Sequence, residues 1–346
     1  MVNVDKLFMK EQFSKNDILE LLTLTDISEL QKLYDKADKV RRDNVGDIVH
    51  MRGIIEFSNY CGRWCSYCGL NASNSNLERY RMSVDEIVET AHKAYDLGYK
   101  TVVLQSGEDS YYTIEIIESI IHKIKDQMDM FITLGLGERP DDEFERMKKA
   151  GADRYLIKHE TSDRELYKKL HPDMSFDERI RCLRTAKRVG LELGSGIMIG
   201  LPGQTLETLA NDILLFKELQ VDMVGMGPYI PHPGTELYKD FNEIGYFAKD
   251  LDFDLEEMVY KMLAVTRLVN KKVNLPATTA LATTNPAKGR ELALSRGANV
   301  VMPNVTDLKY RKMYEIYPAK ACIDEKPEDC RKCIDARITS IGRTPL

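Results

Sequence analysis

Short apolar runs of strand length alternate with amphipathic segments of helical period from about residue 48 to residue 302. The apolar runs predict eight strands, at 48–57, 101–105, 130–136, 154–158, 191–199, 223–229, 275–279 and 299–302. Helices are predicted between them, at about 83–98, 114–125, 141–150, 175–189, 205–218, 255–270 and 288–296. Capping-box patterns, Ser83 with Glu86 and Ser175 with Glu178, mark two of the helix starts.

The regular alternation predicts how the sheet is built. Repeated βα units favour a parallel sheet with right-handed crossovers, and eight of them favour a complete (β/α)8 TIM barrel. Residues 46–309 are predicted to form this α/β barrel, residues 1–45 an N-terminal helical cap, and residues 310–346 a short C-terminal cysteine-containing tail. In the tail, Tyr310, Tyr314 and Tyr317 have the spacing of one helix face, where they either close the open end of the barrel or pack.

Composition and charge exclude several classes of protein. The 346 residues are 43% hydrophobic and 30% charged with a net charge of −6, which is ordinary for a globular protein and gives no sign of nucleic-acid binding. No apolar stretch reaches the roughly 20 residues of a membrane span, and the first residues lack the plan of a signal peptide. Six of the seven cysteines form two close trios, with Cys182 apart, which favours metal ligation in a reducing cytoplasm over disulfides.

The first trio, Cys61, Cys65 and Cys68, has the spacing Cys-x3-Cys-x2-Cys and follows the first predicted strand. Three thiolates can hold a four-iron cluster and leave one iron without a protein ligand, whereas common ferredoxin clusters use four cysteines. The alternative is a zinc site, which usually has four ligands in two pairs. The spacing, with an aromatic residue (Tyr67) before the last cysteine, resembles the radical S-adenosylmethionine (SAM) superfamily. The resemblance implies a 4Fe-4S cluster whose open iron chelates SAM, which one electron splits to methionine and a 5′-deoxyadenosyl radical.

The superfamily resemblance extends to the ends of later strands, where a barrel carries its chemistry. The loop Gln105-Ser106-Gly107-Glu108 resembles the motif that binds the amino group of SAM; the alternative is an acidic turn before the next helix. Glu160, in the run His159-Glu160-Thr161, is implied to accept hydrogen bonds from the ribose diol, and otherwise caps a helix.

Three further residues complete the predicted SAM site. Arg179 offers the planar, forked contact that suits the carboxylate of SAM, the alternative being a surface ion pair. Met198, on the fifth predicted strand, is implied to lie beside the adenine, and Met223, on the sixth, is included among the SAM contacts.

Two other groups of residues suggest metal ligation. The second trio, Cys322-x7-Cys330-x2-Cys333, indicates a second iron–sulfur cluster of the 2Fe-2S or 4Fe-4S kind, or else a zinc site or vestigial thiols. His232 could ligate a metal, but its flanking residues Pro231 and Pro233 favour a rigid loop that shapes the pocket.

Longer segments of the chain resemble one family within this superfamily, the FeFe-hydrogenase maturase HydE. The resemblance covers about residues 40–333 and is carried by strings that include 54–59, 79–82, 104–109, 151–155, 159–161, 200–205, 222–225, 231–233, 276–280 and 297–304. It implies a radical SAM enzyme of H-cluster maturation that acts on a small organometallic iron complex, Fe(CO)2(CN)-cysteine, delivered by the maturase HydG. The deoxyadenosyl radical is implied to attack the cysteine sulfur, and the product to feed assembly of the diiron subcluster on HydF.

An anionic iron complex requires hydroxyl donors and positive charge inside the barrel. Thr133, Lys158, Thr278, Thr279 and Tyr314 are the predicted substrate pocket, although each threonine is equally consistent with strand packing. Lys158 stands where the family is expected to carry Arg, so a point charge replaces a forked contact. SAM cleavage also implies a low-potential electron donor such as ferredoxin or flavodoxin.

Other functions fit less of the sequence. Biotin synthase uses a second cluster inside its barrel, but no cysteine of this chain falls on a predicted strand. A radical SAM mutase of the methylornithine synthase type, which rearranges lysine carbon, is not expected to carry the tail trio. A non-catalytic iron–sulfur electron carrier, a different class altogether, would leave the SAM-contact motifs unexplained.

Overall fold

Six parallel strands form the central sheet of the computed structural model, which describes residues 4–248 and 253–346. Their spatial order follows the chain, so each connection must cross back outside the sheet, as parallel pairing requires. The strands are β2 (Gly53–Ser58), β3 (Thr101–Ser106), β4 (Phe131–Gly135), β5 (Arg154–Leu156), β6 (Glu192–Ile199) and β7 (Met223–Pro228).

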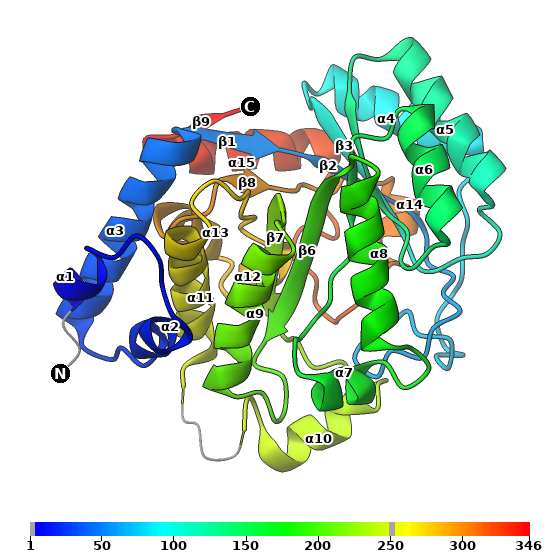
Figure 1. The fold of residues 1–346 in the computed structure, drawn as a ribbon. Helices are drawn as coiled ribbons and strands as arrows, with labels where there is room; N and C mark the ends of the chain where they lie inside the picture. Colours follow the sequence, from blue (N-terminus) through cyan, green and yellow to red (C-terminus); the bar gives the residue numbers. More distant parts are fainter. Residues whose placement is uncertain (1–3, 249–252) are drawn as a thin grey trace.

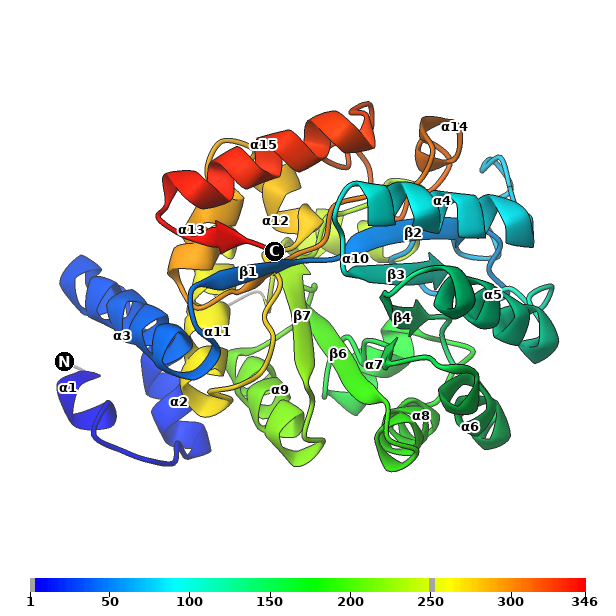
Figure 2. The same cartoon turned by 90° about the horizontal axis from the view of Figure 1, so that it is seen from above.

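The two edges of this sheet, β2 and β7, are linked through shorter segments. Isolated parallel bridges join Met223 to Asn274, Pro276 to Val300 and Asn304 to Ile54. The parallel α/β architecture predicted from the sequence is confirmed. Six continuous strands and two bridge-paired segments occupy the places of the eight predicted strands, and Figure 2 shows the strands arranged around a central axis.

The first predicted strand, 48–57, is divided in the structure. β1 (Ile48–Met51) pairs with β8 (Val300–Val301) and β9 (Thr344–Pro345) in a separate three-stranded sheet, whereas β2 alone pairs with β3. The division falls beside Gly53, where an added Cβ would lie 3.3 Å from the side chain of Val305. A continuous apolar run indicates burial but does not indicate which neighbour each half pairs with.

The seventh predicted strand, 275–279, is also shorter than expected. Pairing extends only to Pro276, and helix α12 (Thr279–Thr284) begins soon afterwards. The hydroxyl of Thr278 accepts a hydrogen bond from the Leu281 N–H at 3.4 Å and caps that helix. Because threonine suits both strands and helix caps, its presence alone could not separate the two.

Helices surround the sheet in Figure 2. Those packed between successive strands are α4 (Val84–Asp96), α5 (Ile114–Gln127), α6 (Asp141–Ala150), α8 (Phe176–Arg188), α9 (Leu206–Glu218) and α11 (Leu255–Val269). Shorter ones are α7 (Arg164–Leu170), α10 (Leu237–Ile244), α13 (Gly289–Ser295) and α14 (Leu308–Arg311). The N-terminal helices α1 (Val4–Leu7), α2 (Lys15–Leu22) and α3 (Ile27–Val45) lie to one side in Figure 1, where α2 and α3 pack against α11 and α2 also against α9.

Two local predictions about helices have different outcomes. Ser83 and Glu86 form the predicted capping box at the start of α4. Ser175 makes no side-chain cap at the start of α8, so that prediction is wrong, because the Glu178 carboxylate accepts from the Arg181 guanidinium instead.

The tail does not form the helix predicted for its tyrosines. α14 ends at Arg311, and the following backbone turns toward the cysteine loop: Met313 O accepts from Asn59 Nδ2 at 2.7 Å and Ile316 O from the Gly69 N–H at 3.0 Å. These carbonyls therefore accept hydrogen bonds from the cysteine loop and not from a helix of the tail. Tyr310 instead stacks on Tyr80, with ring centroids 4.6 Å apart.

The rest of the tail returns to the barrel. The Lys320 ammonium forms a buried ion pair with Glu56 of β2, and the other oxygen of that carboxylate accepts from Asn304 Nδ2 at 2.6 Å. Helix α15 (Pro327–Ser340) then leads to β9, which lies beside β1 at the opposite end of the barrel in Figure 1.

Candidate active site

A cavity of about 310 Å³ lies at the carboxyl ends of the central strands. All three cysteines of the loop after β2 line it, and the walls include most of the predicted SAM contacts. The predicted residues that line this cavity are Cys61, Cys65, Tyr67, Cys68, Gln105, Ser106, Gly107, Glu108, Lys158, Glu160, Arg179, Met198 and Thr278. Segments far apart in the sequence thus converge where a parallel barrel carries its chemistry.

The three thiols lie in a partly buried, electrostatically coupled group. Burial raises the pKa of Cys65 well above its usual value, with further increases from Cys68 and Cys61. Burial likewise raises the pKa of Cys68 to about 12. Such thiols stay protonated at neutral pH in the metal-free protein, whereas bound iron would take them as thiolates and release protons.

The spacing of the sulfurs distinguishes a cluster from a single metal ion. Ligands of one zinc ion bind at about 2.3 Å and so lie within roughly 4.6 Å of one another. Among the described residues, the loop trio is not a set of donor atoms that all lie within 4.8 Å of one another. Three sulfurs around one wall of a cavity, too spread for one ion, fit a polynuclear cluster that is ligated by three cysteines.

Gly107 allows the two loops of this wall to approach closely. An added Cβ would lie 2.2 Å from Tyr60 O and 2.7 Å from the Cys61 Cβ, so no other residue fits without movement. The Gly62 N–H donates to Glu108 O at 3.0 Å and the Gly107 N–H to Ser58 O at 3.1 Å. These bonds fix the cysteine loop against the loop after β3.

Glu160 has the features of a residue held in place for a ligand. Its φ of 62° lies in the left-handed region, a strained conformation for a non-glycine residue, and it forms a bridge with Ile197. The side chain is buried, and its Oε1 accepts from the Tyr67 hydroxyl at 3.4 Å. Oε2 has no hydrogen-bond partner. A buried carboxylate oxygen without a partner is costly unless a ligand supplies a donor.

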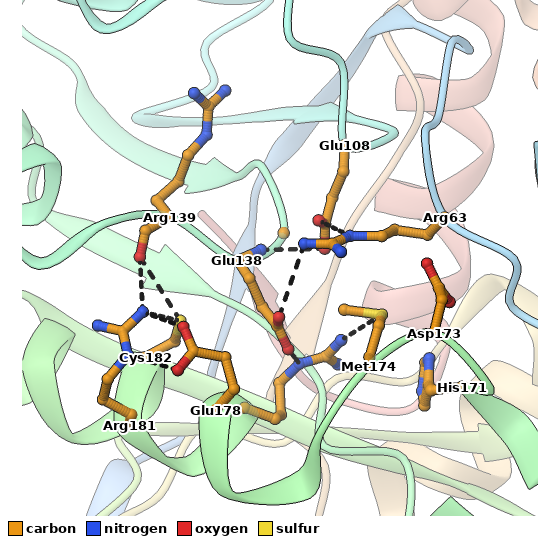
Figure 3. Close-up of polar contacts among 12 residues, drawn as sticks. Arg63, Glu108, Glu138, Arg139, His171, Asp173, Met174, Glu178, Arg181 and Cys182 are labelled. Carbon is orange, nitrogen blue, oxygen red and sulfur yellow. Dashed lines mark hydrogen bonds and ion pairs between the residues drawn. The ribbon is translucent and has the colours of Figure 1, made fainter. Parts of the chain in front are cut away.

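Arg179 belongs to a chain of alternating charges that the sequence did not predict. Arg63, between the first two cysteines, pairs with Glu108 and lies 3.7 Å from the Glu138 carboxylate. Glu138 in turn accepts from Arg179 Nε at 2.8 Å. Figure 3 shows the side chains of Arg63, Glu108 and Glu138 close together. The available signals were the position of Arg63 inside the cysteine motif and of Glu138 after the third predicted strand.

His171 is a second residue that sequence reasoning missed. Its Nδ1 lies 3.2 Å from Cys65 Sγ, and the ring is 1% exposed at the end of α7. Burial lowers the pKa of His171 well below its usual value, with smaller contributions from the positive charges of Arg179 and Arg63. The imidazole is therefore neutral at physiological pH. No motif in the sequence links His171 to Cys65, and only the fold brings the two side chains together.

The structure does not bring every predicted residue to the cavity. Met223 begins β7 at the opposite end from the cavity, and it lines a smaller hollow with Thr133 and the buried Arg52. Thr279 lies in the first turn of α12. Tyr314 is buried next to the site, where its hydroxyl accepts from Gln105 Nε2 at 3.2 Å.

The second cysteine trio is only partly assembled. Cys322, Glu325 and Cys330 have donor atoms within 4.8 Å of one another, whereas Cys333 is exposed and outside that group. The hydrogen bond with Cys330 and the nearby Arg290 lower the pKa of Cys322 to about 6. His232 lies 3.4 Å from Glu315 and its Nδ1 accepts from the Gly234 N–H, contacts that stabilise a loop.

No helix in the described part of the chain has both the length and the apolar character needed to cross a membrane.

Comparisons with known proteins place this site in context. Residues 55–216 match the family model of the Radical SAM superfamily. The [FeFe] hydrogenase maturase subunit HydE of Thermotoga maritima is 47% identical over 336 residues, which cover 97% of this chain and 93% of that protein. The crystal structure of a methylornithine synthase is 28% identical and superposes with a TM-score of 0.82, covering 99% of this chain and 96% of that one. The structure of HydG, a maturase of the [FeFe]-hydrogenase, also has a TM-score of 0.82 at 18% identity, covering 99% and 74%, and supports the fold alone.

Proposed function

The chain belongs to the HydE family of the radical SAM superfamily, and from this premise we propose that it converts a mononuclear iron complex during H-cluster maturation. The proposed substrate is Fe(CO)2(CN)-cysteine received from HydG, and the proposed reaction is radical attack on its cysteine sulfur, with transfer of the product toward HydF. The observation that carries the proposal is the convergence on one cavity of three thiols and a buried carboxylate, Glu160, of which one oxygen has no hydrogen-bond partner.

The residues of the cavity fit the two cofactors that the family implies. Cys61, Cys65 and Cys68 would hold the 4Fe-4S cluster, and the Glu160 oxygen without a partner would accept from the ribose of SAM. When bound, the cluster and SAM together supply an electron and a 5′-deoxyadenosyl group for radical chemistry. A second cluster at Cys322, Cys330 and Cys333 remains a proposal, and Cys322 and Cys330 with Glu325 are its best-placed donors.

Charge in the cavity supports an anionic substrate. Lys158 lines the cavity, and the Arg179 guanidinium is held beside it by a bond to Lys158 O. In a cavity shielded from water these charges act more strongly than at a surface. The Thr278 hydroxyl also faces the cavity and would offer a hydrogen bond to a cyanide or carboxylate group. An ammonium at residue 158 attracts an anion without imposing one orientation.

The test is 5′-deoxyadenosine production by anaerobically reconstituted, reduced protein. SAM is supplied alone, with a synthetic Fe(CO)2(CN)-cysteine complex, or with lysine. Strong stimulation by the iron complex, lost in Cys65→Ala but kept in the exposed control Cys333→Ala, would support the proposal. Stimulation by lysine alone would assign the protein to the mutase reaction of methylornithine synthase, and no cleavage by protein with an intact cluster would exclude radical chemistry and leave an electron carrier.

A further inference from the structure

His171 stands out among the buried residues near the cysteine loop because its contact is with a sulfur. Its ring nitrogen Nδ1 lies 3.2 Å from Cys65 Sγ, within the range of a hydrogen bond to sulfur. The other nitrogen, Nε2, is buried and has no hydrogen-bond partner. The ring therefore has one polar contact among the described residues, and that contact is Cys65.

The fold holds the imidazole firmly in this position. His171 is the C-terminal cap of α7, and its N–H donates to Tyr167 O at 2.8 Å. Its ring packs against the Tyr167 ring with centroids 4.6 Å apart and meets the edge of Tyr67 at 5.4 Å. Two aromatic neighbours and a backbone bond leave the ring little freedom, so the contact with sulfur is built into the site rather than one of many rotamers.

The three cysteines differ in what reaches their sulfurs. Backbone N–H groups of Arg63 and Glu108 hydrogen-bond Cys61, and that of Leu70 hydrogen-bonds Cys68. Cys65 receives a side chain, His171. A sulfur that binds iron is a thiolate and can only accept, so a hydrogen bond from His171 requires the proton on Nδ1. Hydrogen bonds to ligating sulfurs are one of the means by which a protein sets the reduction potential of a cluster.

We infer that His171 is a positioning residue that donates an N–H to the Cys65 sulfur and thereby eases one-electron reduction of the cluster. The inference rests on the proposed function, since it concerns the cluster held by the loop trio. A donor to sulfur withdraws electron density from it and stabilises the reduced cluster relative to the oxidised one. Removing the donor should lower the potential without removing any iron ligand.

The test compares two variants of nearly equal shape, His171→Asn and His171→Leu, in anaerobically reconstituted protein. Asn places an N–H close to the position of Nδ1, whereas Leu has no donor. Redox titration, detected by electron paramagnetic resonance, measures the one-electron reduction equilibrium of the cluster. We expect its equilibrium constant to fall about tenfold in His171→Leu, which corresponds to a reduction potential lower by about 59 mV. His171→Asn should stay near the native value. Equal potentials in the native protein and both variants, each with a full complement of iron, would overturn the inference.

A measurement on the native protein covers the case in which neither variant binds iron. The six histidines are labelled with ¹⁵N and the reduced cluster is studied by electron–nuclear hyperfine spectroscopy. A weak ¹⁵N coupling, together with an exchangeable proton coupling, supports the hydrogen bond. No nitrogen coupling, or a strong one of the kind given by a nitrogen bound to iron, overturns it. If the native protein forms no four-iron cluster, the proposed function itself fails, and the two failures are distinguishable.

Discussion

The two cysteine trios both end in a Cys-x2-Cys pair but differ in what surrounds them. Cys61, Cys65 and Cys68 line the cavity together with Glu160, whose Oε2 has no hydrogen-bond partner. In the tail, Cys322 and Cys330 approach each other while Cys333 is exposed. A cysteine pattern therefore identifies possible ligands, whereas the surrounding polar groups and cavity show which set faces a cofactor.

One thiol of the tail, Cys322, differs from the loop thiols in the direction of its pKa shift. Burial raises the pKa of Cys65 and Cys68, and the three loop thiols disfavour one another's ionisation. In the tail, the Cys330 hydrogen bond and Arg290 favour the Cys322 thiolate. The loop trio thus needs a metal to ionise it, whereas the tail supplies a thiolate on its own.

Removal of one cysteine from each trio should give the largest difference between the trios, measured as retained cluster and SAM cleavage. Cys68→Ala is expected to lose the cluster and with it all SAM cleavage, because two thiolates do not retain four irons. Cys330→Ala, which removes a buried thiol of the tail, should retain both. The measurements are iron and sulfide content and 5′-deoxyadenosine production. Equal losses in both variants would show that the two trios are parts of one functional unit.

In the metal-free protein at pH 7, the alkylation rate of Cys322 should exceed that of Cys68 by about a hundredfold. The Cys322 pKa of about 6 makes it mostly thiolate above that pH, whereas Cys68, at about 12, stays protonated. The lower nucleophilicity of the more acidic thiol offsets part of the difference in ionisation. Iodoacetamide labelling, followed by mass spectrometry of peptides from pH 5 to 9, measures both rates. In Cys330→Ala the Cys322 profile should move to higher pH; an unchanged profile would contradict the assigned cause.

Glu160→Gln should weaken SAM binding about tenfold, because an amide is a poorer acceptor than a carboxylate for the ribose hydroxyls. Glu165→Gln, on the exposed side of α7, is the matched control and should bind SAM normally. Binding is measured by calorimetry on cluster-loaded protein, with iron content checked in each variant. Unchanged SAM affinity in Glu160→Gln would show that SAM does not bind at this carboxylate beside the loop trio.

Gly69→Ala should have the smallest effect, a loss of about 1–3 kcal/mol in the free energy of unfolding. An added Cβ would lie 2.1 Å from Glu315 O and 2.8 Å from His232 Nε2, so the tail must move from the cysteine loop. Gly62→Ala, in the same loop, meets only Glu108 O at 3.7 Å and is the control. Denaturant unfolding of metal-free protein compares them. If both variants have native stability, the packing of the tail against the cysteine loop at Gly69 yields more easily than these distances indicate.

Sequence reasoning predicted the parts of this molecule that local patterns determine. The βα alternation indicated the parallel sheet, and motifs at strand ends indicated the three thiols, the Gln105–Glu108 loop and Glu160, all of which line the cavity. Met223, on the sixth predicted strand, was included among the SAM contacts, but it begins β7 and the cavity lies beyond the end of that strand. The position of a residue along its strand therefore decides which end of the barrel it reaches.

Long-range contacts account for what the sequence did not predict. His171 is 106 residues from Cys65, and Glu138 is 41 residues from Arg179. No periodicity or motif connects such pairs, because each partner looks like an ordinary polar residue near a helix end. The helix predicted for the tail tyrosines does not form for the same reason, because contacts with Asn59 and Gly69 override the local preference for a helix.

The buried ion pair between Lys320 and Glu56 has a consequence for the synthesis of the protein. Its two residues are 264 positions apart, so the tail can enter the barrel only late in translation. The cysteine loop leaves the ribosome about 250 residues before Lys320, an interval of roughly 13 to 50 s at 5–20 residues per second. During that time the later strands are still being made, and the cysteine loop lacks its contacts with the tail. The order of residues along the chain thus makes the tail the last segment to pack against the cysteine loop.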